Sequence, residues 1–151
     1  MSEDLSKAVH AVVRDCLGVK ANEEVLIICN PATQVLGEAM RSEAASVGAE
    51  SVLAVMIERA SHAGEPPATL AAAMIAADVV LAPTVQSLSH TAARKLASES
   101  GTRIATLPGA TTEMLARVMS DDMPELRRRG GRVAEILDHG TEARITCDHG
   151  S

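Results

Sequence analysis

The sequence predicts a three-layer α/β fold in which a mostly parallel, open sheet carries helices on both faces, in a Rossmann-like topology. Short runs rich in valine, isoleucine and leucine alternate with helical patterns along most of the chain, which is typical of βαβ units. Two runs, Glu24–Cys29 and Val79–Ala82, are apolar at almost every position, as expected of strands buried on both faces. A length of 151 residues suits one domain with its own core. We therefore expect a single α/β domain over residues 1–151.

The first part of the chain is expected to hold a helix, a buried strand and a second helix. Ser2 can cap an amphipathic first helix, and Gly18 can end it. A strand over Glu24–Cys29 follows, and Asn30–Pro31 supplies the cap and first-turn proline of a second helix that ends at Gly48. The residues expected to face the core are Leu5, Val9, Val12, Val13 and Cys16 in the first helix and Leu36, Ala39, Met40 and Val47 in the second.

The middle of the chain continues this alternation. A second strand is predicted over Ser51–Met56, and the polar stretch Glu58–Pro66 is predicted to be a mobile loop. An alanine-rich helix over Pro67–Ile75 comes before the next apolar strand. Ser89 is predicted to cap the helix after that strand, and Arg103–Leu107 is predicted to be the fourth strand.

The C-terminal part has a weaker pattern. Pro108–Gly109 turns the chain into a helix capped by Thr111. Pro124 can start another helix, but Gly130–Gly131 would weaken its middle. A last strand is predicted over Ala143–Cys147.

Composition and charge exclude several classes of function. The chain has no Phe, Tyr or Trp and a net charge of -6, so it lacks rings on which bases stack and it repels phosphate backbones. We expect no nucleic-acid partner, and the cluster Arg127–Arg129 with Arg132 is expected on the solvated face of a helix. We also expect no membrane partner, because no apolar run approaches the ~18 residues that span a bilayer. Three cysteines without a paired spacing, and no secretory signal, predict a reduced, cytoplasmic protein.

A histidine and several hydroxyl-bearing residues follow the strand Val79–Ala82. Open α/β sheets bind ligands at the carboxyl ends of their strands, beside helix starts. His90 is expected on the first turn of a helix as a candidate catalytic acid or base, with Ser87, Ser89 and Thr91 as candidate ligand-binding residues. The alternative is an exposed histidine at a helix start that takes no part in chemistry.

Asn30 and Thr33 are a second candidate ligand-binding pair, at the helix start that follows the first strand. This turn lacks the glycines of a dinucleotide fingerprint, and the chain has no phosphate-binding Gly-Lys-Ser/Thr loop. Nucleotide cofactors are therefore disfavoured, but a small anion can bind weakly at a capped helix start. No metal site and no cofactor are predicted for this chain, because the histidines and cysteines lack the spacing of metal ligands and the neighbouring residues that would orient them. The group that comes nearest to a ligand set is Cys147, Asp148 and His149 with His139.

The following stretches carry a resemblance to a known family: Val13–Lys20, Glu24–Ile27, Ala82–Thr84 with Ser87–Thr91, and Thr106–Gly109. Together they resemble the N-terminal domain of aminopeptidase T-like leucyl aminopeptidases, a metallopeptidase family that looks related to 2,5-dihydroxypyridine dioxygenase. The likeness spans nearly the whole chain. In that family a small α/β domain comes before a larger domain that holds the metal-binding glutamates, histidines and aspartate. Gly140–Thr146 resembles the segment that leads into this second domain.

The resemblance implies a function that is shared between two domains. It implies that this chain is the N-terminal, substrate-side domain of a metal-dependent leucyl aminopeptidase-like protein and is inactive alone, because the catalytic metal domain is absent. The divalent metal is implied only for that missing domain. Within this chain the resemblance implies that His90 lines the cleft between domains, with Ser87, Ser89 and Thr91 orienting it or a ligand. The expected partner is the C-terminal catalytic domain or a second copy.

Two further hypotheses stay open at this stage. The chain could be a stand-alone module that binds a small molecule or anion, or that assembles with copies of itself. A redox thiol protein is a third hypothesis, although no cysteine spacing supports it. Whether the chain is itself an enzyme is left undecided by the sequence.

Overall fold

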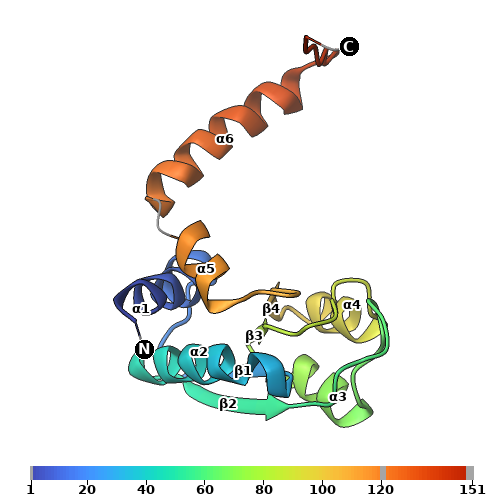
Figure 1. Cartoon of the computed structure of the whole chain (residues 1–151). Helices are drawn as coiled ribbons and strands as arrows, with labels where there is room; N and C mark the ends of the chain where they lie inside the picture. Colours follow the sequence, from blue (N-terminus) through green and yellow to red (C-terminus); the bar gives the residue numbers. More distant parts are fainter. Residues whose placement is uncertain (1, 120–121, 149–151) are drawn as a thin grey trace. The chain divides into compact units, whose positions relative to one another are not determined.

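The computed structural model describes residues 2–119 and 122–148 and divides the chain into two compact units, residues 1–120 and 121–151. The first unit is an α/β domain around one parallel sheet (Figure 1). Its helical segments and strands are α1 (Glu3–His10), a π-helical turn (Ala11–Cys16), β1 (Glu24–Cys29), a 3-10 turn (Pro31–Thr33), α2 (Gln34–Ser46), β2 (Glu50–Val55), α3 (Ala68–Ala76), β3 (Val79–Ala82), α4 (Ala92–Glu99), β4 (Arg103–Thr106) and α5 (Thr112–Val118).

The four strands lie in the order β2-β1-β3-β4, and every neighbouring pair is parallel. The central pair is aligned so that Val25 lies beside Val79 and Ile27 beside Leu81. This order has one reversal: the chain moves from β1 outward to β2 and then crosses back to β3 on the other side of β1. Sheets of this kind bind ligands at the carboxyl ends of the strands next to the reversal. The loops after β1 and β3 are therefore where a ligand site is expected in this sheet.

Helices cover both faces of the sheet, which confirms the three-layer α/β prediction. Alternate residues of β1 and β3 point to opposite faces, because side chains alternate along a strand. Val25 and Ile27 join a core with α1, α2 and α5. Leu26 and Ile28 join a second core with α3 and α4. The near-continuous apolar runs are explained by burial on both sides, since Ile27 and Ile28 are each 0% exposed.

Several of the predicted helix ends agree with the structure. Ser2 accepts the N–H of Leu5 at the start of α1, and Gly18 ends the first helical segment in the left-handed region at a φ of 57°. Gly48 follows α2 in the same region. Pro31 is the first residue of a helical turn as predicted, but this turn is 3-10 and α2 begins after it. Cys16 departs from the prediction of an inward-facing residue: it is exposed.

The second unit consists of α6 (Met123–His139) and the chain that follows it. The helix continues through Gly130 and Gly131, so this glycine pair does not interrupt it. The predicted strand over Ala143–Cys147 is wrong: residues 143–146 belong to no strand, and Cys147 makes only an isolated bridge. His149, named above as part of a tail cluster, lies outside the described residues. Within the described parts of the chain, no helix is long and apolar enough to cross a membrane.

Candidate functional site

Polar side chains gather at the carboxyl edge of the sheet, beside the topological reversal. Asn30 follows β1, the loop Pro83–Thr91 follows β3, and Thr106 is the last residue of β4. Because parallel strands end at the same edge, these residues from distant parts of the sequence come together there. All the candidate site residues predicted from the sequence lie in or beside these segments.

Asn30 joins the ends of three segments. Its side chain is buried, with 1% exposed, and its Oδ1 accepts the N–H of Val85 at 2.8 Å. Its Nδ2 donates to the carbonyl oxygen of Met56 at 2.9 Å. Both ends of the amide are therefore used to hold the loops after β2 and β3 against the end of β1. Thr33, the other residue of this predicted pair, accepts the N–H of Asn30 through its Oγ1 at 3.0 Å.

A chain of three hydroxyl groups crosses the same edge. Ser87 Oγ donates to Ser89 Oγ at 2.9 Å, and Ser89 Oγ lies 2.7 Å from Thr106 Oγ1. Ser87 Oγ also accepts the N–H of Ser89 at 3.1 Å. The three side chains are half-buried or nearly so, and each hydroxyl can donate or accept. Thr106 had not been predicted; its position at the end of a strand was the signal that could have found it.

His90 and Thr91 have different roles in the loop. His90 is exposed and lies in the turn before α4. Thr91 is buried, and its Oγ1 accepts the N–H of Arg94 at 3.1 Å while donating to the carbonyl oxygen of Leu88 at 2.8 Å. The prediction that Ser89 caps this helix is therefore wrong, because Thr91 is the cap. The correction moves His90 from the first turn of the helix to the loop, next to the hydroxyl chain.

The polar stretch after β2, predicted to be a mobile loop, makes specific contacts with the loop after β3. Ser87 donates its N–H to His62 Nδ1 at 2.9 Å, and Ala63 donates its N–H to the carbonyl oxygen of Ser87 at 2.8 Å. Sequence reasoning missed these contacts, since the two partners lie 25 positions apart.

Glu65 occupies the N-terminus of α4. Its two carboxylate oxygens accept the N–H groups of Ala92 at 2.6 Å and Ala93 at 3.2 Å. A negative charge is favoured at this end of a helix, where N–H groups lack helical partners. A small anion at the start of α4 would therefore have to displace a carboxylate that belongs to the protein itself.

The described residues do not form a metal site. Among residues 2–119 and 122–148, no group of three or more His, Cys, Asp or Glu side chains lies close enough to hold a metal ion, although a catalytic zinc normally needs three protein ligands. Cys29 is buried with 0% exposed, and this burial raises the pKa of its thiol. A raised pKa disfavours the thiolate that redox and metal chemistry require.

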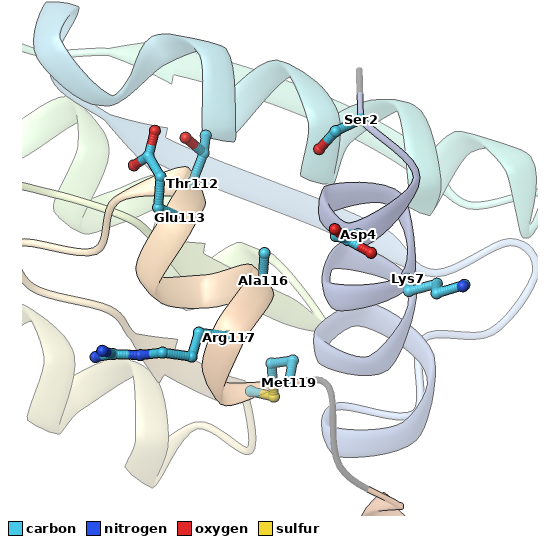
Figure 2. Close-up of a pocket in the computed structure, with 8 residues that line it drawn as sticks. All are labelled: Ser2, Asp4, Lys7, Thr112, Glu113, Ala116, Arg117 and Met119. Atoms are coloured by element: carbon cyan, nitrogen blue, oxygen red, sulfur yellow. The ribbon is translucent and has the colours of Figure 1, made fainter.

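A separate hollow of about 670 Å³ lies between α1 and α5 (Figure 2). Its charged lining is mixed, with Asp4 and Glu113 against Lys7 and Arg117. Figure 2 shows the Lys7 and Arg117 side chains extending away from each other. Hydrogen bonds from its own backbone N–H and from the hydroxyls of Thr111 and Thr112 lower the pKa of Glu113. The mixed charges favour neither an anionic nor a cationic ligand.

The comparisons with known proteins bear on the fold. The chain is similar to the structure of 2,5-dihydroxypyridine dioxygenase from Pseudomonas putida, with a TM-score of 0.77 and 18% identity over 100% of this chain and 47% of that one. It is also similar to wild-type AmpT from Thermus thermophilus, with a TM-score of 0.56 and 17% identity over 88% of this chain and 48% of that one. No family model and no curated protein sequence matches. The expected resemblance is thus confirmed at the level of fold, and the chain spans about half the length of these two proteins.

Proposed function

We propose that this chain is the N-terminal, substrate-side part of a cytoplasmic, metal-dependent hydrolase of the leucyl aminopeptidase type. The observation that carries the proposal is the fold, which this chain shares with about half of AmpT and half of 2,5-dihydroxypyridine dioxygenase. The polar residues gathered at the carboxyl edge of the sheet support the same proposal, because that edge is where such sheets bind ligands.

The proposal divides the chemistry between two parts. Under this proposal a second part of the enzyme would hold the metal that activates water. This chain would contribute one wall of the cleft. The exposed imidazole of His90 would exchange a proton with the substrate or with a water molecule. Ser87 and Ser89 would offer hydroxyl groups to the polar atoms of the substrate.

Binding of a substrate fragment tests the proposal. L-leucinamide, titrated into the isotopically labelled chain at millimolar concentration, should shift the NMR signals of residues 87–91 and of Thr106, together with those of the His90 ring. Weak binding is expected because one wall alone supplies few contacts. The shifts should be lost in His90→Ala and retained in His10→Ala, where the exposed histidine removed lies on α1.

Two results would contradict the proposal. One is the absence of any shift at the carboxyl edge up to the highest soluble concentration of L-leucinamide. The other is a set of shifts confined to the hollow between α1 and α5, which would move the binding site to a different face.

The hypothesis of an assembly module is favoured by a different observation. The apolar side chains of α6 are exposed and none of its residues is buried. This surface belongs to the second unit.

A further inference from the structure

The hydroxyl groups at the carboxyl edge of the sheet form a chain with a defined beginning and end. The N–H of Ser89 donates to Ser87 Oγ at 3.1 Å, and Ser87 Oγ donates to Ser89 Oγ at 2.9 Å. Ser89 Oγ lies 2.7 Å from Thr106 Oγ1, and either of these two atoms can be the donor. The chain therefore begins at a backbone N–H in the loop after β3 and ends on the last residue of β4.

A count of protons shows that this hydroxyl chain has a donor to spare. Each of the three hydroxyl groups carries one proton, and the two contacts between them use two of these protons. Within the described part of the protein, neither Ser89 Oγ nor Thr106 Oγ1 has a further hydrogen-bond partner. The third proton is therefore available to an acceptor atom that comes from elsewhere.

The direction of the hydrogen bonds favours Thr106 as the residue that carries the spare proton. Ser89 Oγ already accepts a hydrogen bond from Ser87. If Ser89 donates in turn to Thr106, all the bonds run head to tail, and bonds in such a chain strengthen one another by polarisation. The opposite direction would make Ser89 Oγ accept twice and would lose this effect. Thr106 Oγ1 is then the donor at the end of a polarised chain.

The position of Thr106 suits contact with a ligand. Its side chain is partly exposed, and it stands at the edge of the sheet where folds of this kind bind ligands. The loop after β3 has other supports, because Val85 and Ser87 donate their N–H groups to Asn30 and His62. The hydroxyl chain is therefore not the only contact that fixes this loop.

We propose that Thr106 donates its hydroxyl proton to the carbonyl oxygen of the substrate. This inference rests on the proposed function, because an aminoacyl amide presents such an oxygen at the bond that is cleaved. A carbonyl oxygen only accepts hydrogen bonds, so it matches a spare donor. The oxygens of Ser87 and Ser89 keep lone pairs with which they can accept N–H groups of the same substrate. Thr106 is therefore a substrate-binding residue in addition to those predicted from the sequence.

Replacing one atom of the ligand isolates this hydrogen bond. The thioamide of L-leucine resembles L-leucinamide in shape, but its sulfur is a weaker acceptor than the carbonyl oxygen. NMR titration of the whole chain, followed through the backbone signals of Ser87 and Thr106, gives a dissociation constant for each ligand. We expect the wild type to bind L-leucinamide about three to ten times more tightly than the thioamide, which is the usual contribution of one neutral hydrogen bond.

Matched variants at two threonines assign the hydrogen bond to Thr106. Thr106→Val keeps the branched shape and removes the hydroxyl group, so this variant should bind both ligands equally. Thr106→Ser keeps a hydroxyl group and should keep the preference for L-leucinamide. Thr69→Val makes the same replacement at an exposed position of α3 and should leave the preference unchanged.

The possible results separate this inference from the proposed function. If neither ligand shifts any signal at the carboxyl edge, the proposed function and the inference both fail. If L-leucinamide binds there but the wild type does not prefer it to the thioamide, the inference alone is overturned, and this result needs no variant to fold. A preference that persists in Thr106→Val also overturns the inference, because another donor then binds the carbonyl oxygen.

Discussion

The buried amide of Asn30 makes the most specific prediction about the carboxyl edge of the sheet. Replacing Asn30 by alanine removes the partners of the Val85 N–H and the Met56 carbonyl. Each unsatisfied buried polar group costs about 1–3 kcal/mol. We therefore expect Asn30→Ala to lower the free energy of unfolding by about 2–5 kcal/mol. The control Gln86→Ala removes an exposed amide whose contact with Glu58 is long, at 3.4 Å. This control should change the free energy of unfolding by less than about 0.5 kcal/mol.

The substitution Asn30→Asp separates the two hydrogen bonds. An aspartate can still accept the Val85 N–H, but its ionised form has no proton to donate to Met56. Burial should raise the pKa of this carboxyl above the value of about 3.9 in the unfolded chain. The stability deficit of Asn30→Asp relative to the wild type should then be largest near neutral pH and should shrink as the pH falls toward about 4.

Urea denaturation at several pH values measures both effects. The reasoning fails if Asn30→Ala unfolds at the same urea concentration as the Gln86→Ala control. It also fails if the deficit of Asn30→Asp is the same at all pH values, because burial would then leave the pKa of the new carboxyl at its value in the unfolded chain.

Three other predictions follow from the packing and charges of the α/β unit. Gly37→Ala should destabilise the α/β unit by about 1 kcal/mol in the same assay. The added Cβ would lie 2.9 Å from Leu53 Cδ1 and 3.0 Å from Cys29 Sγ. The cost of this overpacking exceeds the gain in helix propensity. Hydrogen bonding by Arg103 lowers the pKa of Glu23. Glu23→Gln should therefore lower the free energy of unfolding by about 0.5–1 kcal/mol at neutral pH. This difference from the wild type should vanish as acid protonates Glu23 in the wild type. Burial raises the pKa of the Cys29 thiol, so iodoacetamide should modify Cys29 only when the chain unfolds; rapid native-state labelling would contradict this.

The fold could be predicted because its strongest signals are local. The apolar runs Glu24–Cys29 and Val79–Ala82 became the central strands β1 and β3, where both faces are covered. Gly18 and Gly48 marked helix ends because both adopt the left-handed backbone conformation that glycine tolerates. The strand order could not be read from these patterns, since it depends on how distant segments pair.

The details of the candidate site depend on contacts between distant residues. Ser89 and Thr91 are both acceptable helix caps by residue type, and the path of the loop decides between them. Val85 is hydrogen-bonded to Asn30, and Ser89 lies against Thr106, so Thr91 reaches the helix start.

The C-terminal unit shows a different limit of local patterns. The glycine pair predicted a weakened helix, yet α6 continues from Met123 to His139. The apolar residues at Ala143–Cys147 predicted a strand, but a strand needs a partner along its length, and only Cys147 makes a bridge. Pro124 therefore marked the start of this helix, but the local pattern did not indicate how far the helix extends.

The central claim is that this chain forms one wall of a catalytic cleft and that the metal is held by a second part of the enzyme. Hydrolysis of leucyl-p-nitroanilide by the purified 151-residue chain with added Co²⁺ or Zn²⁺ tests it most directly. We predict a rate no higher than that of the metal ion alone. Sustained turnover, proportional to the concentration of this chain and abolished by chelation, would contradict the claim.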